Sequence, residues 1–453
     1  MNGSCFGRKD HAARDKGPMQ GVVMRHGTIT QKILAAHAVE GPEAIYPGAI
    51  ATIRPDVVLL NDVSGPLAFE QFGAMGATRP FDPRRIVLVA DHFAPAPNVT
   101  AAGAIAMMRD FARKHGIPHY YEPGRGGIEH TLLAELGMVG HGTIVFGADS
   151  HTCTAGAFNA LGIGFGSTDL AGALAMGQLW MRIPASIRVE LTGKPGPFVT
   201  GKDVILELIR RIGSDGAADA ALEFGGPGVA ALGIDERMAV ANMAVEGGAD
   251  SCVFEGDAQS TADMAKRGVP AAAAVMPDAD AEYRQRIEID LSALTPMVAK
   301  PPSPASGVRV DVLRGQKVDQ VYVGNCSNGT MTDLRQVAEI LRGRQVAPGV
   351  RMVVVPATQK IWREALAEGL LEVIAAAGAA VSTPTCGACF GGHMGILAAG
   401  ETAIATTNRN YRGRMGHPDS QVFLSNAWVA AAAAVTGEIV PPDEVGRILE
   451  KSA

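Results

Sequence analysis

Three cysteines are the residues whose type and spacing most clearly indicate chemistry. Cys386 and Cys389 form a C-x-x-C pair in a glycine-rich segment that runs to His393, and Cys326 lies well before them. Six cysteines in 453 residues do not indicate a disulfide framework. These thiols are therefore candidates for a zinc site, a redox dithiol or an iron–sulfur cluster.

The spacing alone favours some of these sites over others. A zinc site of four cysteines needs a second C-x-x-C pair, which this sequence lacks. His393 could still complete a zinc site of three cysteines and one histidine. A redox dithiol usually starts a helix, whereas this pair lies in a glycine-rich loop. A [4Fe-4S] cluster on three cysteines leaves one iron open, and that iron can act as a Lewis acid on water or a hydroxyl. Zinc and iron–sulfur both remain open.

An arginine-rich loop follows the cysteine pair. Residues 407–416 place Arg409, Arg412 and Arg414 in one glycine-flanked turn. A charge cluster of this kind is most often a solvated surface loop. However, the planar guanidinium suits bidentate binding of carboxylates, so the loop is also a candidate binding site for an acidic substrate.

Two histidines adjoin aspartates. His92 follows Asp91, and His151 lies two residues after Asp149. A third histidine, His130, ends the segment GGIEH. A lone histidine is more often structural than catalytic, but a neighbouring carboxylate fixes the tautomer of the imidazole and raises its basicity. These groups are therefore candidates for acid–base chemistry.

The elements that must position these residues have the rhythm of an α/β protein with mostly parallel, buried sheets. Longer alanine-rich segments with helical periodicity, such as residues 101–114, separate short apolar runs that predict strands. The predicted strands are residues 57–60, 86–89, 144–146, 321–323 and 352–355. Four of them are followed by candidate site residues, namely Asn61, Asp91, Asp149 and Cys326. Because ligands bind at the carboxyl ends of parallel strands, and these ends fall in two predicted domains, we expect an active site between domains.

Residues 162–169 (GIGFGSTD) resemble a nucleotide-binding loop only at first sight. The phosphate-binding lysine is missing, and no acidic residue is placed for a ribose. We expect a tight turn followed by a helix whose start is capped near Ser167, Thr168 or Asp169.

Composition limits the class of protein. Apolar residues make up 47% and charged residues 19%, and the net charge is −6, which does not favour binding of nucleic acid. The longest apolar run is too short to span a membrane, so a cytoplasmic protein is expected. Proline- and glycine-rich stretches predict a disordered extension over residues 1–20 and domains over residues 21–195, 196–303 and 304–453.

With these motifs placed, the sequence resembles the aconitase superfamily, and within it the large subunits of 3-isopropylmalate dehydratases and homoaconitases. The matching blocks are DH at 91–92, GADSHT at 147–152, GFGSTD at 164–169, VGNCSN at 323–328, PTCGAC at 384–389 and NRNYRGRMG at 408–416. Asn325 and Ser327 depart from the usual serine and threonine of the family. The resemblance raises iron–sulfur well above zinc.

The resemblance implies a three-domain aconitase-like α/β/α architecture, with mostly parallel sheets around a central cluster and without a swivel domain. It also implies a hydro-lyase that dehydrates or isomerises a small 2-hydroxy acid; a non-catalytic iron-sensing relative is the alternative. A [4Fe-4S] cluster with one open iron would bind to Cys326, Cys386 and Cys389. The implied acid–base groups are Asp91, His92, His130, Asp149, His151 and Glu246, with Asn242 contributing to the cluster environment. The implied substrate-binding residues are Asn61, Ser150, Asn408, Arg409 and Arg414.

In relatives, the base that removes the substrate proton is a serine on a swivelling domain. Fewer than forty residues follow the arginine loop here. The resemblance therefore implies a small partner subunit, in a heterodimer or heterotetramer, that supplies the base. The substrate could be 3-isopropylmalate, homoaconitate, a methylated malate or a related hydroxy-acid.

Overall fold

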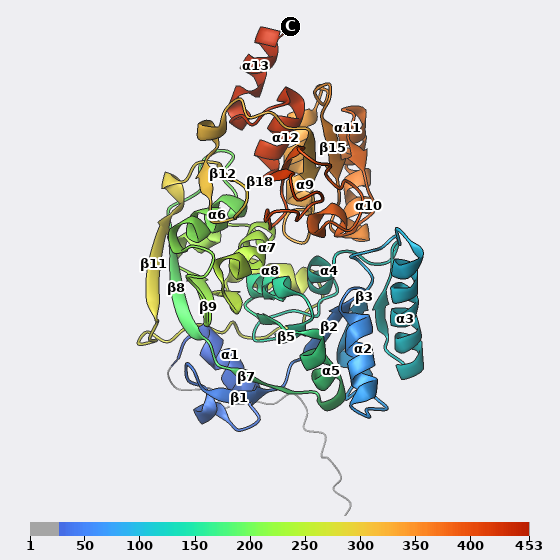
Figure 1. The fold of residues 1–453 in the computed structure, drawn as a ribbon. Coiled ribbons are helices and arrows are strands. Elements are labelled where there is room, and N and C mark those ends of the chain that lie inside the picture. Colours follow the sequence, from blue (N-terminus) through green and yellow to red (C-terminus); the bar gives the residue numbers. More distant parts are fainter. Residues whose placement is uncertain (1–26, 453) are drawn as a thin grey trace, which may run out of the picture.

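The computed structural model describes residues 27–452, which fold around three larger sheets and one two-stranded sheet (Figure 1). The predicted extension over residues 1–20 lies outside the described residues. None of the described helices is long and apolar enough to cross a membrane.

The first sheet carries the predicted acid–base groups. Its order is β4-β3-β2-β5-β6, and all of its strands run parallel. The strands are β2 (Val57–Asn61), β3 (Ile86–Val89), β4 (His119–Tyr121), β5 (Ile144–Gly147) and β6 (Leu161–Gly164). The associated helices are α1 (Ile29–His37), α2 (Gly65–Ala74), α3 (Val99–His115), α4 (Glu129–Glu135) and α5 (Ser167–Met176). A small antiparallel pair, β1 (Ile50–Ile53) with β7 (Leu179–Arg182), lies beside them.

The second sheet has the order β10-β9-β8-β11 and is also parallel. Its strands are β8 (Ala185–Thr192), β9 (Ala220–Gly225), β10 (Ser251–Phe254) and β11 (Gln285–Asp290). Its helices are α6 (Gly201–Ile212), α7 (Ile234–Asn242) and α8 (Ala258–Lys266). The strand β8 pairs in this sheet although it precedes the boundary expected near residue 195.

The third sheet carries the cysteines on its loops. Its order is β13-β12-β18-β17-β14-β15-β16, with antiparallel pairing only at β12. The strands are β12 (Met297–Ala299), β13 (Gly307–Arg309), β14 (Gln320–Val323), β15 (Arg351–Val354), β16 (Ala380–Val381), β17 (Thr402–Ala405) and β18 (Gln421–Ser425). The helices are α9 (Met331–Leu341), α10 (Gln359–Ala367), α11 (Leu370–Ala376), α12 (Ala427–Thr436) and α13 (Val445–Ser452).

One hydrophobic core connects the three larger sheets, because side chains alternate between the two faces of each strand. Leu59, Val87 and Val145 point to one face of the first sheet and pack in the same cluster as Leu222 of β9 and Leu424 of β18. The opposite faces of the first and third sheets pack on their own helices in two further cores. The predicted α/β class with mostly parallel sheets is confirmed, and the carboxyl ends of β2, β3, β5 and β14 lie where the sheets meet.

One local prediction was wrong. Gly162–Gly164 is part of β6 and not a tight turn, and α5 begins at Ser167 with Gly166 as a cap that offers no side chain. The glycines serve close packing, because a Cβ at Gly162 would overlap the carbonyl oxygen of Thr152 on the short helix Ser150–Phe158. The expected helix start was correct, but the expected side-chain cap was not.

Candidate active site

The three predicted cysteine ligands lie together, buried and in no disulfide. Cys326 follows β14, and Cys386 and Cys389 lie at the short helix Gly387–Phe390. The N–H of Cys386 donates to the carbonyl oxygen of Asp91 at 2.8 Å, which fixes the cysteine loop against the end of β3. The thiols of the third sheet are thereby placed over the acid–base groups of the first.

Amide side chains contact the sulfurs. Asn242, the last residue of α7, donates to Sγ of Cys326 at 3.0 Å, and Asn408 donates to the same sulfur at 3.3 Å. The other end of the Asn408 amide lies 3.4 Å from Sγ of Cys389. Hydrogen bonds from amides favour the thiolate form and tune a metal centre that the thiolates bind.

The donor set fits a polynuclear cationic centre. Burial, together with the nearby Cys386 and Cys389, raises the pKa of Cys326 well above its ordinary value. Burial likewise raises the pKa of Cys386, and two such neighbouring thiols ionise together only if positive charge lies between them, as the irons of a cluster provide. The alternative zinc ligand, His393, uses Nε2 on the Thr385 hydroxyl and the His92 carbonyl oxygen, both at 3.2 Å.

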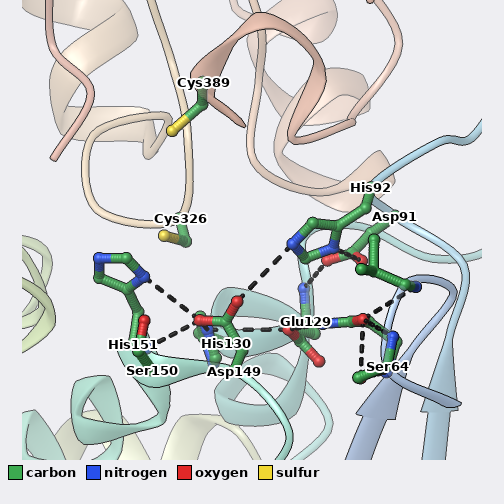
Figure 2. Close-up of polar contacts among 12 residues, drawn as sticks. Ser64, Asp91, His92, Glu129, His130, Asp149, Ser150, His151, Cys326 and Cys389 are labelled. Atoms are coloured by element: carbon green, nitrogen blue, oxygen red, sulfur yellow. Dashed lines mark hydrogen bonds and ion pairs between the residues drawn. The ribbon is translucent and has the colours of Figure 1, made fainter. Parts of the chain in front are cut away.

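Opposite the thiols, three imidazoles surround the carboxylate of Asp149 (Figure 2). One of its oxygens contacts Nε2 of His130 at 3.0 Å and Nδ1 of His151 at 3.2 Å, and the other lies 3.7 Å from Nε2 of His92. Burial opposes ionisation, but these three histidines hold the pKa of Asp149 well below its usual range. Asp149 is therefore a fixed negative charge that orients all three rings.

His92 is held from its other side by Asp91. Nδ1 of His92 contacts Asp91 at 2.7 Å, and both residues are buried. Burial opposes protonation of His92, but the neighbouring Cys386 and Asp91 raise its pKa well above the ordinary value. The carboxylate of Asp62 accepts hydrogen bonds from the backbone N–H groups of Asp91, His92 and Phe93 and so fixes this loop.

On the far side, Glu246 links His151 to the arginine loop. One oxygen of Glu246 contacts Nε2 of His151 at 3.0 Å and accepts from Nε of Arg409 at 2.7 Å. Arg409 also donates to the Ser150 hydroxyl at 2.9 Å. Burial opposes ionisation of Glu246, but His151 and Arg409 lower its pKa. Arg414 donates to the carbonyl oxygen of Cys389 at 2.8 Å, whereas Arg412 pairs with the exposed Asp419.

The structure thus brings all the predicted site residues into one region, around one small cavity. The cavity is lined by His92, Glu129, His130, Asp149, His151, Asn408, Arg414 and the three cysteines, with Ile128 and Phe390. Asp91, Ser150, Glu246 and Arg409 lie behind the lining residues and contact them directly. The amide of Asn61 reaches the cavity through Glu129, to which it donates at 2.8 Å.

Sequence reasoning missed Glu129. Its side chain is 1% exposed, and its Oε2 has no hydrogen-bond partner among the described residues. Burial, with the negative Asp91 beside it, raises the pKa of Glu129 to about 8. In the sequence only its neighbour His130 stood out. The sequence feature that could have indicated Glu129 is its position directly before His130, shortly after two glycines.

The fold and the site together define an α/β protein with a candidate metal centre between its sheets, and comparison with known proteins agrees. The model of the aconitase family (aconitate hydratase) matches residues 31–314 and 309–437. The 3-isopropylmalate dehydratase large subunit 2 of Rubrobacter xylanophilus is 52% identical over 92% of this chain and 98% of its own length. The large subunits from Moorella thermoacetica and Acetivibrio thermocellus are 50% and 48% identical over 92% of this chain and 99% of their own lengths.

Among solved structures, Thermococcus kodakaraensis aconitase X in its holo-form covers 79% of this chain and 84% of its own, at 12% identity and a TM-score of 0.44. The sequence matches establish the relationship: this chain belongs to the aconitase family, as its motifs predicted.

Proposed function

We propose that this chain is the large, iron–sulfur subunit of a 3-isopropylmalate dehydratase, a hydro-lyase of leucine biosynthesis. The observation that carries the proposal is the set of three buried, unpaired thiols facing the Asp149 carboxylate and its three histidines. Identities near 50% over almost the whole length of large subunits support the choice of substrate. Such an enzyme acts in the cytoplasm.

Cys326, Cys386 and Cys389 would hold a [4Fe-4S] cluster. Asn242 and Asn408 would donate hydrogen bonds to Sγ of Cys326. When bound, the cluster supplies an open iron that acts as a Lewis acid on the substrate hydroxyl.

The chain's own residues bind the substrate and move the proton of the leaving hydroxyl. Glu246 and Ser150 hold Arg409 in one orientation, and in the described part of the chain its Nη1 is left without a partner and can meet a substrate carboxylate. Arg414, anchored only through Nε, offers its terminal nitrogens to a second carboxylate. One of His92, His130 and His151, which Asp149 and Asp91 orient, donates the proton that turns the departing hydroxyl into water, and it takes a proton back from water on re-addition. Asn61 orients the substrate through Glu129.

The base that removes the proton next to a carboxylate would come from a small partner subunit. The designation of the relatives as large subunits supports such a partner. One swivel domain of about 160–210 residues would complete the site.

The test is anaerobic co-expression with the small subunit encoded nearby, followed by assay of a panel of hydroxy-acids for the conjugated alkene product. We expect about four irons per large subunit, absorbance near 400 nm and turnover of 3-isopropylmalate only in the complex. Cys326→Ala should lose iron and activity, whereas Cys252→Ala, at a buried cysteine away from the site, should keep both. Stoichiometric zinc without iron would refute the cluster, and a loaded complex inactive on every acid would favour an iron-sensing role.

A further inference from the structure

Lys202, near the start of α6, is a completely buried cation with uncharged partners. Its side chain has 0% exposure, and Nζ donates to Oδ1 of Asn328 at 2.9 Å and to the carbonyl oxygens of Thr406 and Thr407 at 2.7 and 2.9 Å. All three ammonium hydrogens are therefore satisfied. Lys202 forms no ion pair with any residue between 27 and 452.

Burying the Lys202 ammonium group without an opposite charge costs free energy, and its position at the start of α6 does not offset this cost. Desolvating an ammonium group costs several kcal/mol unless a negative charge compensates. A lysine in the first turn of a helix also opposes the helix dipole, which favours negative groups there. The carboxylate most directly linked to Lys202 is Asp333, and it is reached only through Asn328, whose amide donates to it at 3.1 Å.

The acceptors of Lys202 belong to two segments beside the candidate cluster site, one that carries Cys326 and one that carries Asn408. Asn328 lies two residues after Cys326, and Thr407 directly precedes Asn408, which donates to Sγ of Cys326. Burial lowers the pKa of Lys202 to about 8, while Asp333 and the sulfurs of Cys389 and Cys326 act to raise it. The positive charge is thus joined by hydrogen bonds to the segments of Cys326 and Asn408, and Lys202 is not among the residues that line the cavity.

We propose that Lys202 is the buried counter-charge of the iron–sulfur cluster: it stabilises the negative charge of the loaded site while holding together the segments that carry Cys326 and Asn408. This inference rests on the proposed cluster. A [4Fe-4S]²⁺ core on three thiolates has a net negative charge, and a buried cation near it raises its reduction potential and strengthens its binding.

The test compares the loaded and iron-free protein in Lys202→Met, which keeps the length of the side chain and removes its charge. The Tm of wild type should rise on anaerobic reconstitution, and this rise should be clearly smaller in the variant, while the iron-free variant is at least as stable as iron-free wild type. A reductive titration followed by electron paramagnetic resonance should find the variant's midpoint potential shifted to more negative values. Lys202→Arg, which keeps the charge, should retain the wild-type potential.

A purely structural lysine would give a different result, because its loss would lower Tm equally with and without iron and leave the potential unchanged. That result would overturn the proposal. So would a failure of both Lys202→Met and Lys202→Gln to fold without iron. Asp333→Asn is the matched control: loss of this negative charge should leave the midpoint potential unchanged or move it to more positive values, and a shift to more negative values, as in Lys202→Met, would contradict an electrostatic role for Lys202. The iron content of wild type separately tests the cluster itself.

Discussion

At the scale of single residues, Glu129 is a carboxylic acid whose ionisation is strongly displaced by its position in the cavity. Its pKa rises from an ordinary value of 4.5 to about 8 because burial and Asp91 disfavour the carboxylate. The folded chain therefore holds a proton on Glu129 at neutral pH, and the unfolded chain releases it. The stability associated with this proton is fully present below about pH 4.5 and is lost as the pH rises through about 8.

Glu129→Gln should remove this dependence. The difference in free energy of unfolding between the iron-free variant and wild type should grow in the variant's favour by up to about 1.4 kcal/mol per pH unit between pH 5 and 8. Urea denaturation across this range measures it. A constant difference would show that Glu129 is ionised in the folded chain.

Asn242 would act on the proposed cluster through its hydrogen bond to Sγ of Cys326. Asn242→Ala should release iron to a chelator about 10–100 times faster, since loss of such supporting contacts weakens metal sites by that factor. Asn98→Ala, which removes only the N-cap of α3, is the control and should cost about 1 kcal/mol of stability without changing iron release. Equal release rates in the two variants would mean that the amide does not support the cluster.

At the scale of elements, the short helix Ser150–Phe158 places Asp149, Ser150 and His151, and its position depends on glycines. Gly162→Ala would drive a methyl group into the carbonyl of Thr152. We expect a loss of about 1–3 kcal/mol and a larger relative loss of activity, because His151 moves with this helix. Thermal denaturation and kcat/KM measure the two effects.

Gly103→Ala is the matched control, since a Cβ there meets nothing within 4 Å in the middle of α3. It should be neutral or stabilising by up to about 1 kcal/mol. A similar change in activity for both variants would exclude a positioning role for the close contact at Gly162.

Elements were predictable where the signal was local. The apolar runs that predicted strands at residues 57–60 and 86–89 correspond to β2 and β3, because a fully buried parallel strand needs a continuous apolar run. Gly162 was wrongly predicted to lie in a turn, because glycine occurs both in tight turns and in closely packed strands. Only the contacts of the folded chain distinguish the two. Lys202 was missed for a similar reason: a single lysine at a helix start is normally solvated, and its partners come from residues 328 and 406–407, more than a hundred positions away.

At the scale of the whole molecule, the site exists only where three sheets meet. The thiols come from loops of the third sheet, and the imidazoles come from loops and short helices of the first. Asn242, at the end of α7, and Glu246, just after it, come from the part of the chain that forms the second sheet. Cysteine spacing and strand ends predicted two of these contributions from sequence. The amide contacts between Asn242, Asn408 and Cys326 depend on long-range packing, which no local pattern encodes.

The cluster would bind cysteines on loops of the third sheet, and its sulfur ligand Cys326 accepts a hydrogen bond from Asn242 of the second. Its removal should therefore destabilise the region where the sheets meet and not only the cysteine loops. Chelation of the iron under an oxidant should lower the Tm, since a ligand present at one hundred times its Kd and bound only by the folded chain adds about 2.7 kcal/mol. Hydrogen exchange should accelerate at residues 324–329 and 384–393, and also at residues 90–93, because the N–H of Cys386 and the Thr385 hydroxyl both donate to the carbonyl of Asp91. Exchange in the antiparallel pair β1–β7, whose buried residues pack in the core on the opposite face of the first sheet, is the internal control. Acceleration confined to the cysteine loops would show that the first sheet holds its acid–base groups in place without the cluster.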